Sequence, residues 1–500
     1  MTATAAFDTL SEADTASSAA EAPFAGREKT VHEVDLCVIG AGSAGLSVAY
    51  GASHLGRSVV LFERETMGGD CLNTGCVPSK ALIKAAKLAN DRRHGSAYGI
   101  APVEPEIDFD AVKAHIQGVI DQIAPVDSVE RYEGFGVTAI KEDAAFTDEK
   151  TIESETHIVR AKRIVVAAGS RANVIPIPGM DTVDYLTNET IFQVDRLPEH
   201  LMIIGSGPIG LEMGQSFRRL GSEVTIIDIA EPLGRFDPEH AKVLIEQLER
   251  EGVQFRAPAK TQSVSQGADG AISVHFEGGE TLTGSHLLMA AGRAPNVEGL
   301  ELEKAGVSYD RRGIETDASL RTSNPRVYAA GDIAAGKGGL THAAGFHAGA
   351  LIKNLYFMPP GLGGLLAKAT TSRMPAVIYT QPELGTIGAG HDAAVKTLHF
   401  EFDENDRAIA ERQTAGGVKL YLDEKSKLIG ASVVGEQAGE LINTISLAMA
   451  GGLKLSQITA MISPYPTRTE AVKRAASSHF TDAVFGPKAK ALSGFWTRFQ

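Results

Sequence analysis

Two segments of the chain share one alternation of apolar and small residues. The first, "VDLCVIGAGSAGLSVAYGASHLGRSVVLFER", opens with an apolar run that leads into Gly40, Gly42 and Gly45, continues with helical periodicity, and ends in a second apolar run before Glu63. Glycines at this spacing permit a tight turn and the close approach of a pyrophosphate to a helix N-terminus, and the acid can bind ribose hydroxyls. The segment therefore predicts a Rossmann dinucleotide-binding unit.

The same order returns in "LMIIGSGPIGLEMGQSFRRLGSEVTIIDIAE". Gly205, Gly207 and Gly210 take the glycine places, and Asp228 follows at the end of the second apolar run. One chain is thus predicted to bind two dinucleotides. An enzyme that needs two usually passes a hydride from a nicotinamide to a flavin.

Three shorter apolar runs, "RIVVAAGSRANVIPIPG", "LLMAAGRAPN" and "NPRVYAAGDIA", each end in small residues. Their order fits a flavin domain that is interrupted by a nicotinamide domain, with Asp332 returning the chain to the flavin. From about Ser372 the pattern becomes strand, turn, strand and long helix without a glycine-rich loop, which indicates a separate α+β packing or dimerisation domain. The predicted fold is α/β, with these ranges: 1–30 disordered extension, 31–185 first segment of the FAD domain, 186–300 NAD(P) domain, 301–371 second segment of the FAD domain, 372–485 interface domain, 486–500 amphipathic tail.

Composition narrows the classes of partner and compartment. The chain has 500 residues, 43% of them hydrophobic, and a formal charge of -14, which argues against general affinity for nucleic acid or anionic membranes. The N-terminus lacks a signal-peptide core, and no run reaches the roughly 18 apolar residues of a membrane span. Three cysteines cannot build a secretory disulfide framework. We therefore expect a cytoplasmic protein without stable membrane insertion.

Two of the three cysteines lie in "GGDCLNTGCVPSK", as Cys71 and Cys76. Residues five apart in a straight helix are separated by about 7.5 Å along its axis, beyond the roughly 4.4 to 6.8 Å between Cα atoms that a disulfide tolerates. A bridge therefore requires a distorted first turn, which the Asn, Thr and Gly between them allow. Beside two dinucleotide sites, a redox pair is favoured over two buried thiols, whereas Cys37, inside the first strand, is expected to be a small buried hydrophobe.

The cysteine string, both glycine motifs, "AAGR", "AAGD" and the C-terminal domain together resemble the flavoprotein disulfide reductases of the pyridine nucleotide family, over about residues 33 to 480. Members include dihydrolipoyl dehydrogenase, glutathione reductase and mercuric reductase. The resemblance implies an obligate homodimer that binds FAD and NAD(P). It also implies that Cys71 exchanges with substrate, Cys76 is the thiolate beside the flavin, Lys80 lies near the flavin, and Glu212 pairs with Lys80.

The cofactor-binding residues follow from the motifs and the resemblance, and no metal site is expected. For FAD they are Gly40, Gly42, Ser43, Ala44, Gly45, Glu63, Gly69, Lys80, Ala144, Gly169, Gly331, Asp332, Thr341, His342 and Ala343. For NAD they are Gly205, Gly207, Pro208, Ile209, Gly210, Asp228, Gly292 and Arg293. A carboxylate at position 228 accepts bonds from ribose hydroxyls and repels a 2′-phosphate, so NADH is expected to be preferred to NADPH, unless Arg218, Arg219 or Arg235 reaches that phosphate.

The chain departs from the family in "ISPYPTRTE". Members with a His-Glu dyad carry histidine before Pro-Thr, whereas here Tyr465 takes that place and Glu470 remains. A phenol with a pKa near 10 cannot replace imidazole as a base at neutral pH. Mercuric reductases also carry tyrosine in this stretch, although this chain lacks their paired tail cysteines and N-terminal CxxC. The sequence therefore predicts a mercuric-reductase-like NAD(P)H-dependent oxidoreductase acting on a small-molecule or protein disulfide or a related soft electrophile; the alternatives are dihydrolipoyl dehydrogenase and a flavoprotein redox sensor.

The C-terminal segment "GPKAKALSGFWTRFQ" places Leu492, Phe495, Trp496 and Phe499 on one helical face. Its charges are Lys488, Lys490 and Arg498. Packing of this face against the protein's own dimer is favoured here over docking to a membrane surface or another partner.

Overall fold

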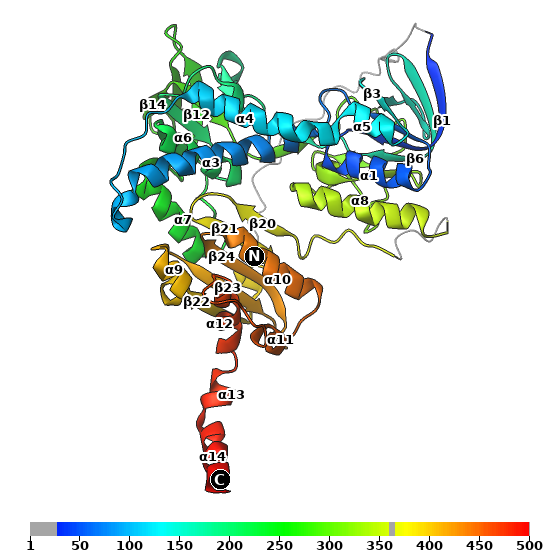
Figure 1. Ribbon diagram of the computed structural model, residues 1–500. Coiled ribbons are helices and arrows are strands. Elements are labelled where there is room, and N and C mark those ends of the chain that lie inside the picture. The colour runs from blue at the N-terminus through cyan, green and yellow to red at the C-terminus, as the bar shows by residue number, and fades with distance from the viewer. Residues whose placement is uncertain (1–27, 360–365, 500) are drawn as a thin grey trace.

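The computed structural model describes residues 28–359 and 366–499. Most of the predicted N-terminal extension, residues 1–27, lies outside the described residues. Figure 1 shows two α/β lobes side by side, a third lobe beneath them, and two C-terminal helices that extend from the third lobe. The α/β class with two dinucleotide-binding units and a C-terminal α+β domain is confirmed.

The first lobe is built on a sheet with the strand order β3-β2-β1-β6-β5-β4, in which β19 also pairs with β6. Pairing is parallel among β1, β2, β3, β6 and β19 and antiparallel among β4, β5 and β6. Strand β2 and the buried C-terminal ends of β1 and β6 read as apolar runs because both faces of the sheet are covered there. The strands are β1 Thr30–Ile39, β2 Val59–Phe62, β3 Val137–Ile140, β4 Ala145–Phe146, β5 Thr151–Glu153, β6 His157–Val166 and β19 Val327–Ala329. The helices beside this sheet are α1 Ser43–His54, α5 Val129–Gly134 and α8 Thr341–Tyr356, and α2 Gly69–Asn73 follows β2 in the chain. Helices α3 Cys76–Arg93 and α4 Phe109–Ile123 come from the same stretch of chain but lie along the second lobe (Figure 1).

The second lobe repeats the parallel arrangement, with the order β11-β10-β9-β15-β8. Strand β8 spans the boundary predicted between residues 185 and 186, and it forms the edge of this sheet. The elements are β8 Tyr185–Leu186, β9 His200–Ile204, α6 Pro208–Leu220, β10 Glu223–Ile227, α7 Pro238–Arg250, β11 Val253–Arg256 and β15 His286–Met289. Smaller sheets are formed by β12 Thr261–Gln266, β13 Ile272–Phe276 and β14 Thr281–Gly284, by β7 Ser170–Ala172 and β16 Arg293–Pro295, and by β17 Tyr309–Asp310 and β18 Gly313–Ile314.

The third lobe is an antiparallel sheet with the order β20-β21-β24-β23-β22. Strands β23 and β24 and helix α10 form the predicted succession of strand, turn, strand and long helix. The elements are β20 Pro375–Ile378, β21 Glu383–Gly388, β22 Lys396–Glu401, α9 Asp406–Ala410, β23 Gly417–Leu422, β24 Leu428–Gly435, α10 Ala438–Ala450, α11 Leu455–Thr459, α12 Glu470–Ser478, α13 Thr481–Phe485 and α14 Pro487–Trp496.

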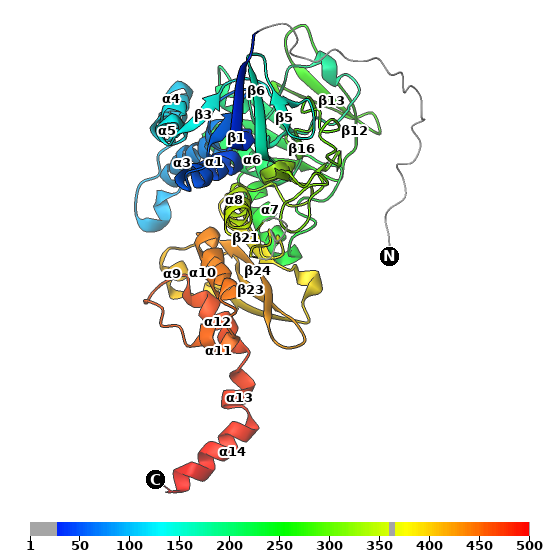
Figure 2. The ribbon, with the colours of Figure 1, turned by 90° about the vertical axis from the view of Figure 1, so that its right-hand side faces the viewer.

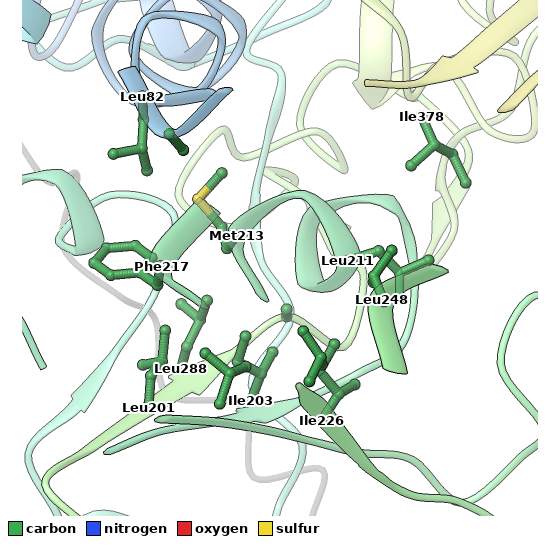
Figure 3. Close-up of a cluster of buried hydrophobic side chains, with 14 of the residues drawn as sticks. Leu82, Leu201, Ile203, Leu211, Met213, Phe217, Ile226, Leu248, Leu288 and Ile378 are labelled. Carbon is green, nitrogen blue, oxygen red and sulfur yellow. The ribbon is translucent and has the colours of Figure 1, made fainter. Parts of the chain in front are cut away.

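One apolar cluster joins α3 to the second and third lobes (Figure 3). Leu82 of α3 lies in it together with Leu211 of α6 and Ile378 of β20, and all three side chains are at most 2% exposed. Burial of this kind contributes roughly 1.5 to 3 kcal/mol for each large aliphatic side chain. Helix α3, which begins at Cys76, is therefore fixed against the second and third lobes, although its sequence lies in the first segment of the FAD domain (Figure 1).

Helices α13 and α14 continue beyond the third lobe and point away from it in both ribbon views (Figures 1 and 2). Helix α14 begins at Pro487, a residue whose fixed φ suits the first helical turn. Leu492, Phe495, Trp496 and Phe499 are all exposed. Among the described residues, no helix is long and apolar enough to cross a bilayer.

Candidate active site

A cleft of about 2010 Å³ opens where the three lobes meet. The N-terminal turn of α1, the segment from Gly69 to Lys80, the first turns of α6 and α8, strand β20 and helix α10 all contribute to its lining. Both glycine motifs therefore lead to one space. Of the predicted site residues, those that line the cleft are Gly40, Gly42, Ser43, Ala44, Glu63, Gly69, Cys71, Cys76, Lys80, Ala144, Gly169, Pro208, Ile209, Glu212, Arg293, Gly331, Asp332, Thr341 and His342.

The first glycine motif has the geometry of a dinucleotide-binding turn. Gly40 has a φ of 99°, and a Cβ there would lie 2.5 Å from the Ala167 carbonyl oxygen, while a Cβ on Gly45 would lie 1.8 Å from the Gly40 oxygen. Gly42 is the N-cap of α1 and has no side chain to cap the first N–H groups, which face the cleft. Glu63 accepts a 2.7 Å hydrogen bond from the Ala41 N–H, so its carboxylate is held at the rim where a ribose would bind. These residues fit a bound dinucleotide.

The second motif is built in the same way. A Cβ on Gly205 would lie 2.4 Å from the Ala290 oxygen and one on Gly210 would lie 2.0 Å from the Gly205 oxygen, whereas Gly207 borders open space. Asp228 accepts hydrogen bonds from the Ser206 N–H and hydroxyl at 2.7 and 2.6 Å. Burial opposes ionisation of Asp228, but these bonds outweigh it and hold its pKa below the ordinary value. A carboxylate thus stands at the end of β10.

Part of the predicted NAD site lies outside the lining of the cleft. This part consists of the glycines of the second motif and the acid at the end of β10: Gly205, Gly207, Gly210 and Asp228. They surround the N-terminus of α6, whose first turn enters the cleft through Pro208 and Ile209. Gly45 and Ala343 are also outside the lining, because Gly45 packs against Gly40 and Ala343 is buried. Gly292, likewise outside it, has a φ of 94°, and its carbonyl accepts a hydrogen bond from the Asn173 N–H.

The two cysteines lie on separate helices, because α2 ends at Asn73 and α3 begins at Cys76. Gly75 interrupts the helical path with φ and ψ of -129° and -109°, which is the distortion that the sequence requires. Both cysteines are thiols in this structure. The Cys76 Sγ lies 3.3 Å from the Thr341 Oγ1.

The thiols have opposite acidities. A hydrogen bond from Cys71 is the main cause that lowers the pKa of Cys76 to about 6; burial opposes it, and Thr341 and the charge of Lys80 assist. The same bond, together with burial, raises the pKa of Cys71 above its ordinary value. The directions of the two pKa shifts favour the thiolate form on Cys76 over that on Cys71.

Lys80 lies one helical turn beyond Cys76 and is held by two groups. Its Nζ donates to the Glu212 Oε2 at 2.9 Å and lies 4.4 Å from the centre of the Tyr379 ring. The other oxygen of Glu212 accepts the Tyr379 N–H at 2.9 Å. Glu212 is only 6% exposed, so this carboxylate fixes both the lysine and the strand end that covers it. No sequence motif pointed to Tyr379, because its role depends on a contact between lobes.

These observations can be set beside known proteins. Residues 34–348 match the sequence model of the family described as pyridine nucleotide-disulphide oxidoreductase, and residues 374–476 match its dimerisation domain. The chain belongs to this family. The resemblance inferred from the cysteine string is therefore confirmed, and the protein is an enzyme of an FAD-dependent family that uses NAD(P)H.

Several family members cover nearly the whole chain. A mercuric reductase from Staphylococcus aureus is 34% identical over 455 residues, which are 89% of this chain and 82% of that protein. A mercuric reductase from Streptomyces lividans is 33% identical over 468 residues, 90% of this chain and 97% of that one. A dihydrolipoyl dehydrogenase from Bacillus subtilis is 31% identical over 464 residues, 90% of this chain and 99% of that one.

The fold is also that of solved family members. The structure of LpdA from Mycobacterium tuberculosis superposes with a TM-score of 0.81 at 24% identity, over 89% of this chain and all of that one. The HOCl-induced flavoprotein disulfide reductase RclA from Escherichia coli gives a TM-score of 0.77 at 24% identity, over 89% of this chain and 99% of that one. At this identity the likeness is one of fold.

In this family member, Arg293 ties the cysteine loop to the first lobe. Its Nε donates to the Ser170 hydroxyl at 2.7 Å, and its Nη2 donates to the Ser170 carbonyl at 2.6 Å and forms an ion pair with Asp70, the neighbour of Cys71. Asp332 accepts the Ser170 hydroxyl at 2.7 Å. The "AAGR" and "AAGD" segments thus meet at one serine beside the thiols.

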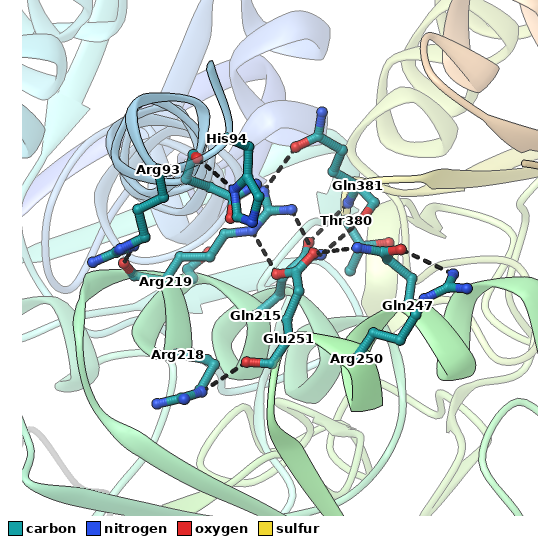
Figure 4. Close-up of polar contacts among 12 residues, drawn as sticks. Arg93, His94, Gln215, Arg218, Arg219, Gln247, Arg250, Glu251, Thr380 and Gln381 are labelled. Atoms are coloured by element: carbon teal, nitrogen blue, oxygen red, sulfur yellow. Dashed lines mark hydrogen bonds and ion pairs between the residues drawn. The ribbon is translucent and has the colours of Figure 1, made fainter. Parts of the chain in front are cut away.

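A second network holds α6 against its neighbours (Figure 4). Arg219 is 5% exposed and binds both carboxylate oxygens of Glu251, at 2.7 and 2.8 Å. Its Nη1 also donates to the Gln381 side chain at 2.9 Å, and Arg93 of α3 donates to the Arg219 carbonyl at 2.6 Å. Arg218 donates to the Glu251 carbonyl. Both arginines are therefore engaged at the far end of α6 from its nucleotide-facing turn.

Tyr465 and Glu470 lie outside the lining of the cleft. Tyr465 is 72% exposed, and its hydroxyl donates to Asp406 of the same chain at 2.8 Å. This bond raises the pKa of Tyr465 further. Glu470 is the first residue of α12. Within one described chain, the structure does not bring these two residues to the thiols. No group of three or more His, Cys, Asp or Glu among the described residues is arranged to hold a metal ion.

Proposed function

We propose that the enzyme passes two electrons from NADH, through FAD, to the Cys71–Cys76 pair and on to a disulfide or a related soft electrophile. The observation that carries the proposal is the thiol pair itself, in which Cys76 is stabilised as a thiolate beside Lys80 and Thr341 in a cleft that both glycine motifs enter. Bound FAD supplies the two-electron relay between nicotinamide and thiols.

The thiols perform the exchange with substrate. The Cys71 proton passes to the Cys76 thiolate, and the Cys71 sulfur attacks the substrate disulfide, forming a mixed disulfide and releasing one thiolate. Cys76 then loses its proton and attacks the Cys71 sulfur, which releases the second substrate thiolate and forms the Cys71–Cys76 disulfide. The two electrons lost by the cysteine pair are those gained by the substrate. Lys80 and Thr341 favour the thiolate form of Cys76 throughout.

Tyr465, at the position of the usual catalytic histidine, limits the class of substrate. The phenol of Tyr465, bound to Asp406, is a poorer proton acceptor than an imidazole. Electron acceptors whose reduction needs no proton transfer through this residue are therefore favoured. Hg(II), a soft cation with high affinity for thiolates, is one of them. The likeness to mercuric reductases at 33% to 34% identity supports the same direction. Hg(II) would be a substrate here and not a resident metal.

Coenzyme choice is proposed to favour NADH. The ionised Asp228 at the end of β10 would accept ribose hydroxyl hydrogen bonds and repel a 2′-phosphate. Arg218 and Arg219 are engaged with Glu251, so they do not offset this charge. Arg235 is exposed in the loop after β10 and, of the three arginines considered, is the one free to approach a phosphate.

We also propose that the enzyme works in the cytoplasm as an obligate homodimer, with the third lobe as its interface. The match of residues 374–476 to the family's dimerisation domain supports the dimer. In such a dimer Tyr465 and Glu470 would serve the partner's thiols, which accounts for their distance from the cleft of their own chain. We also propose the predicted site residues and domain ranges, and the match to the family's sequence models supports them.

The deciding experiment measures NADH oxidation with a panel of acceptors: small disulfides, quinones and Hg(II). Cys71→Ser and Cys76→Ser should each abolish turnover with disulfides and Hg(II). Turnover that survives both substitutions would show that the electrons leave the flavin directly. No turnover with any acceptor, together with a change of shape on reduction, would indicate a redox sensor.

Dihydrolipoyl dehydrogenase is the second candidate, and the alignment with the Bacillus subtilis enzyme over 99% of its length favours it. Oxidation of dihydrolipoamide with NAD⁺ tests it directly. Robust turnover with Tyr465 in place would show that histidine is not required at this position and would move the assignment to that activity.

A further inference from the structure

The C-terminal helices α13 and α14 form an exposed arm that nothing in the proposed chemistry uses. Among the described residues from 481 to 499, only Gly486 and Ala489 are even partly buried. The match to the family's dimerisation domain ends at residue 476, so the arm lies beyond the region that the family shares. It also points away from the lobes in both ribbon views (Figures 1 and 2).

The arm is amphipathic, and its apolar face is aromatic. Leu492, Phe495, Trp496 and Phe499 follow the i, i+3, i+4, i+7 spacing of one helical face. The rings of Phe495, Trp496 and Phe499 contact one another, with centroids 5.0 to 6.3 Å apart. Phe499 is 71% exposed and Trp496 is 58% exposed. Aromatic side chains gathered on one face of an exposed helix match the composition of helices that lie in a lipid interface.

The charge of the arm is opposite to that of the rest of the chain. Lys488, Lys490 and Arg498 are its cations and Asp482 is its single acid, whereas the whole chain carries -14. At about 100° per residue, Lys490 falls opposite the aromatic face and Arg498 falls at its border, where both can meet lipid headgroups. Lys488 falls on the aromatic side and reaches the headgroups only by extending its side chain. A basic, aromatic helix binds anionic lipid both through its positive charge and through burial of its apolar side chains.

The acidic body would oppose such binding unless it stayed at a distance. Helices α13 and α14 contain 5 and 10 residues, which extend up to about 22 Å at a rise of about 1.5 Å per residue. This exceeds the screening length of about 8 Å at physiological ionic strength. The arm is therefore long enough to let its tip reach an anionic surface while repulsion from the body is screened.

From these observations we propose that α14, together with the 3-10 turn Thr497–Phe499 that follows it, binds reversibly to anionic lipid bilayers, lying in the interface with Phe495, Trp496 and Phe499 toward the acyl chains. A second copy of the chain, the partner expected from the sequence, is the competing occupant of the same aromatic face. A single helix of this kind binds weakly, and two arms on one dimer would bind more tightly through their effective concentration.

Trp496 makes the test specific, because it is the only tryptophan in the chain. Adding phosphatidylcholine vesicles that contain phosphatidylserine to the full-length flavoprotein should shift tryptophan emission to the blue and carry the protein to the vesicle fraction. Pure phosphatidylcholine and high salt should each reduce binding at least tenfold. Deletion of residues 486–500 should remove binding.

Substitutions separate the contribution of the aromatic face to lipid binding from that of the basic residues. Phe495→Ser with Phe499→Ser should reduce partition at least tenfold, and Lys490→Glu with Arg498→Glu should do so only for anionic vesicles. Lys425→Glu with Lys427→Glu, in the exposed hairpin between β23 and β24, is the matched charge control and should bind as wild type does. Trp496 emission that is already blue-shifted without lipid, depends on protein concentration and disappears with the dimer would overturn the proposal in favour of a second copy. The absence of vesicle binding would overturn it as well.

Discussion

The acidity of Cys76 should depend on Lys80 by an amount that can be worked from the structure. The two residues are four positions apart on α3, so their side chains share one helical face at about 6 Å. At that distance a unit charge is worth about 2.8 kcal/mol at an effective dielectric of about 20 and about 0.7 kcal/mol in water. Lys80→Met should therefore raise the pKa of Cys76 from its value of about 6 by about 0.5 to 2 units.

Glu212 acts in the opposite direction, because its negative charge raises the pKa of Cys76. Glu212→Gln should thus lower that pKa, while the amide oxygen can still accept the Tyr379 N–H. The lowered pKa of Cys76 also affects stability. A thiol whose folded-state pKa is lowered stabilises the reduced protein at pH values above the unfolded pKa of about 8.5, and that contribution is lost as the pH falls through about 6.

The assay is the pH dependence of alkylation in a Cys71→Ser background, where the serine hydroxyl replaces the thiol donor. Cys37 is fully buried, so Cys76 is the reactive thiol. Lys84→Met is the matched control, because Lys84 is exposed and lies about 12 Å along the helix from Cys76, beyond the screening length of about 8 Å. If the pH midpoint of alkylation moved equally in Lys80→Met and Lys84→Met, or in neither variant, the proposed effect of Lys80 on Cys76 would be refuted.

Three further outcomes are expected. Asp228→Ser should reduce the preference for NADH over NADPH at least tenfold in kcat/KM, and a wild type that already favours NADPH would contradict the role of this carboxylate. Tyr465→His should raise dihydrolipoamide oxidation from near zero, whereas Tyr465→Phe should slow disulfide or Hg(II) turnover without slowing flavin reduction by NADH. Arg219→Met should destabilise the protein by about 3 to 5 kcal/mol, because it leaves Glu251 buried without its cation. The control Lys242→Met removes an exposed ion pair and should cost under about 1 kcal/mol. Parallel denaturation experiments measure both changes.

Much of the fold was predictable because its signals are local. Gly40 and Gly205 adopt positive φ within contiguous motifs, and the apolar runs around them match buried parallel strands. The break between α2 and α3 was likewise predictable, because Cys71 and Cys76 are five residues apart and a glycine precedes Cys76. These features depend on neighbours in the sequence.

The remaining features of the site depend on contacts between distant segments. Tyr379, directly after β20 and almost three hundred residues from Lys80, covers that lysine, and Ser170 joins Arg293 to Asp332 across two lobes. No periodicity or motif contains that information. The pairing of Lys80 with Glu212 was anticipated only through the family resemblance, and the burial of Glu212 that makes the pair matter is visible only in three dimensions.

The apolar cluster that joins the lobes restricts how this enzyme can be recombined. Along the sequence, residues 186–300 resemble a cassette that could be exchanged to change coenzyme preference. Their inner face, however, packs Leu211 against Leu82 of α3 and Ile378 of β20, and their Glu251 is neutralised within the cassette by an Arg219 that also holds Gln381 outside it. A grafted cassette would meet a foreign surface on α3, the helix that carries Cys76 and Lys80. Chimeras that transplant α3 and the β20–β21 segment together with the cassette should fold and turn over, whereas grafts of the cassette alone should misplace the thiolate.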